Sequence, residues 1–190
     1  MFNSINFPKS TIFTQELSIK LCNLIDLPSN SSYPLIYQAS KDGFSANDFH
    51  SKVDNTTGTL TVIKTTKGFV FGVFASISWK YQYPGLINDA NALMFSLVNS
   101  YNIPIKLRKL NEYVIDTIVF KGPSFFDISI LSYSNISTNY AYVSSSQIST
   151  SITIDDMNSF LVGGNTFLVS QIEVYQLDSK IKILNSKYHF

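Results

Sequence analysis

The sequence has little of what a metal centre, a disulfide-bonded domain or a nucleic-acid-binding protein needs. Among its 190 residues there are one cysteine, Cys22, and two histidines, which exclude an internal disulfide and a cysteine-based or histidine-rich metal site. There are 14 Lys and Arg against 13 Asp and Glu, so the net charge is +1. Phosphate binding requires a surplus of cations that displaces counterions, and none is present. We expect no nucleic-acid partner, no metal and no cofactor.

Long apolar runs and targeting signals are also missing. The N-terminus has no basic region followed by an apolar stretch, as a secretory signal has. No segment approaches the roughly 20 consecutive apolar residues of a membrane-spanning helix. We therefore expect an intracellular, cytoplasmic protein that does not insert into membranes.

Apolar and aromatic residues are abundant, and they follow the pattern of strands. Hydrophobic residues make up 45% of the chain and aromatic residues 14%, which argues against intrinsic disorder. Short alternating apolar runs separated by turn residues predict many strands and few helices. Neither a repeat nor a linker divides the chain, so we expect one mainly β (α+β) domain over residues 1–190.

Three short helices are predicted from caps and stops. The first begins at the cap Thr14, carries one apolar stripe and ends before Pro28; the stripe consists of Leu17, Leu21, Leu24 and Ile25. Ser45 and Asp48 resemble a capping box for a helix that runs to about Lys52. The third spans residues 155–161 and is stopped by Gly163-Gly164.

The clearest strand signal is a hairpin formed by residues 59–66 and 69–77, joined by a turn at Lys67-Gly68. Gly72 inside the second strand indicates a bulge or a close backbone approach. Residues 93–97 are compatible with a strand or a helix. Further strands are predicted near residues 34–39, 105–110, 114–120, 125–131 and 166–177.

An ordered set of segments resembles a known family. The set consists of Leu35–Ser45, Asp48–Lys52, Thr59–Lys64, Val70–Gly72, Trp79, Asn91–Leu97, Gly122–Phe125 and Phe167–Gln176. Together these segments are similar to the TLDc domain family of eukaryotes. The resemblance covers roughly residues 10–177 and leaves a short C-terminal extension, residues 178–190.

The resemblance implies a fold and a function. Members of the family fold as a sandwich of two antiparallel β-sheets with a few short flanking helices. Several bind the vacuolar proton ATPase and modulate its assembly, and some protect cells against oxidative damage, with no settled enzymatic activity. By this resemblance the chain binds pump subunits, regulates their assembly and contributes indirectly to oxidative-stress resistance, at the periphery of vacuolar or lysosomal membranes.

The chain departs from the family pattern at three places. Gln38 stands where the family often has Arg, and Val53 stands where it often has Cys. Phe126-Asp127 directly follows Gly122–Phe125, where a glycine-rich turn is usual. The changes remove a cation and a thiol, and shorten or stiffen a loop. A chain with such changes can keep a fold and lose a partner, because functional sites are grafted on folds.

Candidate catalytic residues have simpler structural roles. Asp42, Ser45 and His50 lie close together in sequence, but a triad requires a defined geometry. Ser45 is a helix cap, and Asp42 can stabilise the same helix start through its dipole. For His50 we expect a hydrogen bond to the backbone or a place in the core near Trp79, with pH sensing as the alternative. We expect no catalytic residue.

Two further residues are candidates for chemistry: Cys22 for a redox reaction and Glu173 for a buried charge. Cys22 lies on the apolar helix stripe, so peroxide reduction by its thiol is not expected. Alternation places Glu173 on a partly polar face of its strand with Gln171 and Tyr175. Glu173 is then either exposed to solvent, or paired with another side chain or turned toward a binding protein. For the paired case, the hypothetical counter-charge is Lys64, on the 59–66 strand.

We expect this protein to act by protein–protein contact, through loops on a rigid sandwich. The candidate contact or motif residues are Lys41, Asp42, Gly43, Ser45, His50, Lys64 and Glu173. Two alternatives stay open at this point: an adaptor for a different protein partner, and an enzyme or direct antioxidant.

Overall fold

A computed structural model describes residues 7–28, 31–83, 85–109, 113–137, 141–143, 148–150 and 152–177. The helices of this part of the chain are α1 (Gln15–Ile25), α2 (Ala39–Asp42), α3 (Ala46–Val53) and α4 (Met157–Val162). Its strands are β1 (Leu35–Gln38), β2 (Thr59–Thr65), β3 (Val70–Ala75), β4 (Leu86–Asn88), β5 (Leu93–Val98), β6 (Ile105–Lys109), β7 (Tyr113–Asp116), β8 (Ser124–Phe125), β9 (Ile128–Ile130), β10 (Ala141–Val143), β11 (Ile148–Ser149) and β12 (Val169–Gln176).

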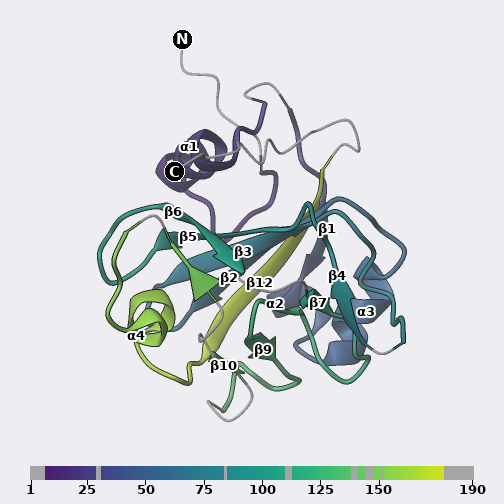
Figure 1. Cartoon of the computed structure of the whole chain (residues 1–190). Helices are drawn as coiled ribbons and strands as arrows, with labels where there is room; N and C mark the ends of the chain where they lie inside the picture. The colour runs from purple at the N-terminus through teal and green to yellow at the C-terminus, as the bar shows by residue number, and fades with distance from the viewer. Residues whose placement is uncertain are drawn as a thin grey trace.

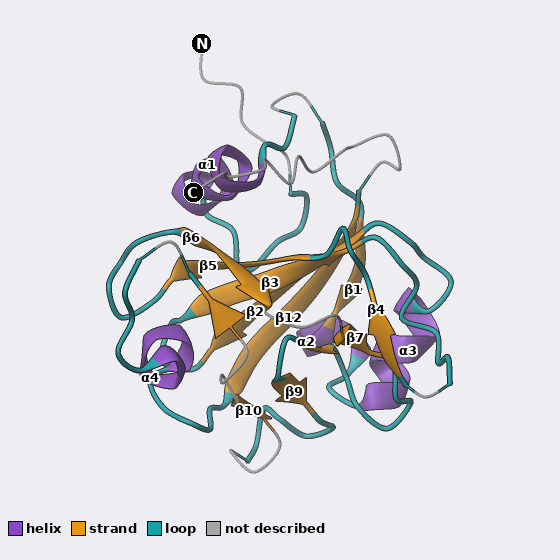
Figure 2. Cartoon of the chain, viewed as in Figure 1, coloured by secondary structure: helices purple, strands orange, loops and turns teal. Residues whose placement is uncertain are grey.

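The strands form two antiparallel sheets, as the family resemblance implied. The larger sheet has the order β1-β12-β2-β3-β5-β6-β11, and the smaller has the order β10-β9-β8-β7-β4. Figure 1 shows β12, in yellow, between the much earlier strands β1 and β2. Figure 2 shows α1, α3 and α4 in purple at the periphery, around this β-rich centre. The fold is a mainly β sandwich with a few short helices.

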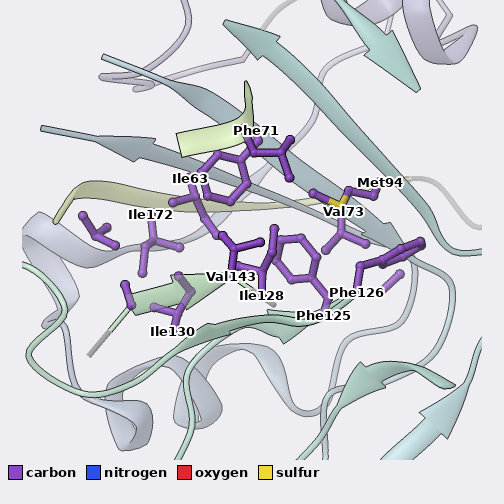
Figure 3. Packing of buried hydrophobic residues seen from close by; sticks show 14 of the residues in the cluster. Ile63, Phe71, Val73, Met94, Phe125, Phe126, Ile128, Ile130, Val143 and Ile172 are labelled. Carbon is purple, nitrogen blue, oxygen red and sulfur yellow. The ribbon is translucent and has the colours of Figure 1, made fainter. Parts of the chain in front are cut away.

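The inner core lies between the two sheets. Ile63, Phe71 and Val73 of the larger sheet are fully buried, and they belong to the same apolar cluster as Phe125 and Ile128 of the smaller sheet. Figure 3 shows these side chains meeting between the strands. Full burial of such a side chain contributes about 1.5–3 kcal/mol, so this layer supplies much of the stability.

A second apolar cluster covers the opposite face of the larger sheet. Leu21 and Ile25 of α1 pack there with Leu60, Phe95 and Tyr175, all of them buried. Figure 1 shows α1 on the side of the larger sheet away from β9 and β10. Because both faces of the larger sheet are covered, β2 and β3 are buried at nearly every position. This burial explains why β3 has no alternating polar residues.

The predicted helix caps are confirmed. Thr14 accepts a hydrogen bond from Leu17 N at the start of α1, and Ser45 and Asp48 form a complete capping box at the start of α3. The third helix, α4, ends at Gly163, whose φ of 77° is left-handed. Each signal depends on residues within one turn, so local sequence is sufficient to place it.

Several strand predictions differ from the structure. The predicted strand over residues 114–120 ends at Asp116, and residues 119–120 lie in a turn. The predicted strand over residues 125–131 divides into β8 and β9, because Phe126 and Asp127 form a tight turn with φ of 48° and 66°. Residues 93–97 lie in a strand. α2, β4, β10 and β11 were not predicted, since elements of two to four residues carry no periodicity.

Gly72 allows a close backbone approach in the centre of the larger sheet, as predicted. A Cβ atom there would lie 2.1 Å from the carbonyl oxygen of Thr61 and 2.7 Å from the ring of Phe95. The pairing of β3 with β5 also shifts register close to it, between Val70 and Phe71. Only glycine fits this position without displacing a neighbouring strand.

We expect Gly72→Ala to lower the free energy of unfolding by about 3 kcal/mol, because the added methyl group overlaps backbone that cannot move freely. Urea unfolding followed by circular dichroism measures the loss. Gly122→Ala is the matched control, since its Cβ would lie 3.2 Å from the nearest atom, the carbonyl oxygen of Ile130. Equal losses in the two variants would contradict the close approach at Gly72.

Candidate functional site

The chain turns sharply between β1 and α3, and α2 lies in this turn. The carboxylate of Asp42 accepts a hydrogen bond from Gln38 N at 2.8 Å, and the Tyr37 hydroxyl donates to the carbonyl oxygen of Gly43 at 2.7 Å. Gly43 has a φ of 112°, which favours glycine. We call residues 39–48 the corner; its backbone is held by side chains from both of its ends.

Ser45 and Asp48 complete the corner. Ser45 Oγ accepts from Asp48 N at 3.1 Å, and the Asp48 carboxylate accepts from Ser45 N at 3.0 Å. A Cβ atom on Gly43 would lie 2.1 Å from Asp48 Oδ2, so this box also requires the glycine. The Asp42 carboxylate bonds Gln38 N and lies 3.5 Å from Lys52 Nζ. Its expected interaction with the dipole at the start of α3 stays a prediction.

One lysine lies at the surface of the corner, and a second lies beside it on α3. Lys41 is exposed at the end of α2, and Lys52 is 51% exposed on α3 while it pairs with Asp42. Lys41 thus carries an exposed positive charge on a backbone that is fixed by hydrogen bonds. Recognition surfaces commonly have this form, mobile side chains on a rigid support.

His50 connects α3 to the smaller sheet. Its ring is 8% exposed; Nδ1 lies 2.6 Å from Asp54 Oδ1, and Nε2 lies 2.9 Å from the carbonyl oxygen of Lys121. Both neighbours are acceptors, so a ring protonated on both nitrogens donates to each. The predicted backbone hydrogen bond is confirmed. Among the described residues, no hydrogen bond joins His50, Ser45 and Asp42 to one another.

An open hollow lined by aromatic side chains borders the corner, and sequence reasoning missed it. Ala46 N at the start of α3 donates to Ser132 Oγ at 2.9 Å. The hollow has a volume of about 440 Å³ and is lined by Phe120, Lys121, Leu131, Ser132, Tyr133 and Tyr142. Phe120 is 69% exposed, and the ammonium group of Lys121 pairs with Asp116. The sequence signal was weak, because Phe120 falls at the end of a predicted strand.

Glu173 and Lys64 lie elsewhere, on the outer face of the larger sheet, and they do not pair. The register of β12 with β2 places Glu173 opposite Val62, and Gln171 opposite Lys64. Glu173 is completely buried. The expectations of an exposed Glu173 and of a Glu173–Lys64 pair are therefore wrong. The chain segment before α1 covers this face, which alternation within β12 could not reveal.

The positions that depart from the family pattern have clear structural roles. The Gln38 side chain donates to Glu173 Oε1 at 3.1 Å, and Val53 is fully buried in the inner core. Phe126 is 3% exposed in its tight turn. Gln38 thus meets the buried carboxylate with a neutral amide.

Cys22 is buried in α1, as predicted. Its side chain is 4% exposed, and burial raises the pKa of the thiol to about 12. The described residues hold no group of three or more His, Cys, Asp or Glu placed to bind a metal ion. Among the helices described, none has the length and apolar character to cross a membrane.

These observations define a class, a two-sheet antiparallel sandwich with a hydrogen-bonded corner and an adjoining aromatic hollow. In a comparison with protein-family models, the TLDc domain matches residues 7–178. The chain therefore belongs to the TLDc domain family. A comparison with curated proteins gave no match.

We expect Ser45→Ala to lower the free energy of unfolding by about 1 kcal/mol, because an unsatisfied N–H remains at the start of α3. Chemical denaturation measures the change. Asn47→Ala, at an exposed position of the same helix, serves as the control and should have a smaller effect. An unchanged Ser45→Ala protein would show that the capping box does not hold the corner.

We expect the Cys22 thiol to react slowly with a disulfide reagent in the folded protein and rapidly in denaturant. At pH 8 about one folded molecule in ten thousand carries the thiolate, given a pKa of about 12. The raised pKa also means that stability falls as the pH rises above 9, since only the unfolded thiol ionises there. If the Cys22 thiol of the native protein reacted as fast as the thiol of glutathione, Cys22 would not be buried as described.

Proposed function

We propose that this protein is a non-catalytic interaction module that binds the vacuolar proton ATPase and regulates its assembly. Its family membership over residues 7–178 carries the proposal. The domain binds a peripheral part of the pump, and any protection against oxidants follows indirectly from that contact. This role places the protein in the cytoplasm, at vacuolar or lysosomal membranes through its partner.

The corner and the aromatic hollow support a contact with protein. The two adjoin, because Ala46 N bonds Ser132 Oγ and His50 bonds the Lys121 carbonyl. Exposed aromatic side chains beside cations are typical of the residues that carry binding energy in protein interfaces. In this proposal Phe120 inserts into the partner, and Lys41 contributes long-range attraction.

Regulation requires a difference between two affinities. A domain that binds the assembled and the dissociated pump equally well cannot shift the equilibrium between them. A tenfold preference for one state corresponds to about 1.4 kcal/mol and displaces the equilibrium tenfold toward that state. The function proposed here therefore depends on unequal binding to the two states.

We expect the purified chain to bind the assembled pump and its detached peripheral sector with different affinities, measured by biolayer interferometry. Phe120→Ser and Lys41→Glu should each weaken binding about tenfold, through a lost apolar anchor and a reversed charge respectively. Ile103→Ser is the matched control, because Ile103 is 46% exposed on a different loop.

Three results would count against this function. Absence of pump binding at low salt, together with co-purification of other proteins from cell lysate, would favour an adaptor for a different partner. Equal affinity for both pump states would remove regulation. Consumption of peroxide by the purified chain, with or without a thiol donor, would favour a direct antioxidant.

A further inference from the structure

The segment before α1 binds to the outer face of the larger sheet as a peptide ligand would. We call residues 7–13 the strap. The ring of Phe7 stacks on Phe13 at 4.2 Å, and its edge meets Tyr175 at 4.9 Å. Phe7 also packs 5.3 Å from Tyr33, and Ile12 is 2% exposed. Apolar side chains thus anchor both ends of the strap.

Between these anchors, the buried carboxylate of Glu173 binds the strap. Ser10 Oγ donates to Oε2 at 2.6 Å, and Thr11 donates to Oε1 from N at 2.6 Å and from Oγ1 at 2.9 Å. The sheet supplies the other donors, Gln38 Nε2 to Oε1 at 3.1 Å and the Tyr175 hydroxyl to Oε2 at 2.7 Å. Three of these five bonds come from the strap.

All five donors are neutral. Among the described residues, no ion pair of Glu173 is formed, although its side chain is completely buried. Burial, and then the charge of Glu173, raise the pKa of Tyr175, so its hydroxyl remains a donor. A buried charge contributes little net stability, because a protein with well-packed apolar residues in its place is often as stable or more stable. The carboxylate is matched by a segment that brings hydrogen-bond donors.

The sheet uses the Thr11 hydroxyl both as a donor and as an acceptor, whereas the Ser10 hydroxyl donates to the sheet and accepts from the strap itself. Thr11 Oγ1 donates to Glu173 and accepts from Gln171 Nε2 at 2.9 Å. Ser10 Oγ donates to Glu173 and accepts from Phe13 N at 2.8 Å, which bends the strap. Recognition that uses both the donor and the acceptor of a hydroxyl discriminates strongly against segments that lack it.

We propose that this outer face is a peptide-binding groove, occupied in the isolated chain by its own strap. Its ligand is a tightly bent segment of a partner protein with an aromatic residue, two consecutive hydroxyl residues three and four positions later, and a second aromatic residue six positions after the first, which stacks on it. The strap, from Phe7 to Phe13, has this pattern. The groove adjoins the corner, because Ser40 exchanges hydrogen bonds with Gln171. Its polar contacts to the strap come from Glu173, Gln171 and Gln38, whereas the proposed function is argued from Lys41 and Phe120.

The strap controls access to the groove because it is tethered. A short tether gives an effective concentration of about millimolar, so an external segment must bind tightly or arrive at high local concentration. Weakening the strap while leaving the groove intact should open the site. The substitutions Ser10→Ala and Thr11→Val achieve this, since they remove both hydroxyl donors and keep the backbone.

The test measures binding of a fluorescent, end-capped peptide with the sequence of residues 7–14 to the full-length chain. We expect the Ser10→Ala/Thr11→Val protein to bind it at least tenfold more tightly than the wild type, because the peptide restores the missing donors. Adding Glu173→Gln to that protein should abolish the gain, since an amide places N–H where the donors point. A control peptide with Ala and Val in place of its Ser and Thr should bind at least tenfold more weakly.

A second variant guards against misfolding. Phe7→Ala removes one apolar anchor of the strap and leaves the polar contacts. Circular dichroism and a cooperative thermal melt identify which of the variants with a weakened strap, the loosened proteins, are folded. If folded loosened proteins bind no peptide at 1 mM, or bind the control peptide equally well, the strap is only structural. If light scattering shows that they dimerise and the peptide reverses this, the occupant is a second copy and the partner assignment is wrong.

Discussion

The placement of β12 between β1 and β2 is the pairing on which the structure depends. This strand comes from the end of the described chain and pairs along most of its length with β2, from Val169 opposite Thr65 to Gln176 opposite Thr59. Its side chains alternate between the two cores, with Ile172 in the inner cluster and Tyr175 in the outer one. Neither cluster is complete until this long-range pairing has formed, so we expect it to be a late and slow step in folding.

The larger sheet is the middle layer of the molecule, and this position explains where the surfaces of interest lie. The smaller sheet covers its inner face, and α1 with the strap covers its outer face. The aromatic hollow lies among residues that line or follow the strands of the smaller sheet, beside α3. The polar groove of Glu173 lies under the strap. The corner adjoins both surfaces, because Ser40 bonds Gln171 and Ala46 N bonds Ser132 Oγ.

The candidate residues divide by what their side chains contact. Asp42, Gly43, Ser45 and His50 shape the corner through hydrogen bonds to their own neighbourhood and to the smaller sheet. Lys41 remains at the surface, where a partner can reach it. A hydrogen-bonded corner with an exposed cation, next to exposed aromatic rings, fits the proposed action by contact. Family membership gives that arrangement its most specific interpretation.

The sequence by itself determined whatever depends on a few neighbouring residues. The cap of α1 at Thr14, the capping box of Ser45 with Asp48 and the β2–β3 hairpin were predicted correctly, because each is stabilised within one turn or one tight loop. Its ordered segments were also sufficient to indicate the family. Only the tertiary structure decided the environment of Glu173 and the aromatic hollow. Both bring together segments far apart in the chain, up to 163 positions for Ser10 and Glu173, and burial is a property of that meeting.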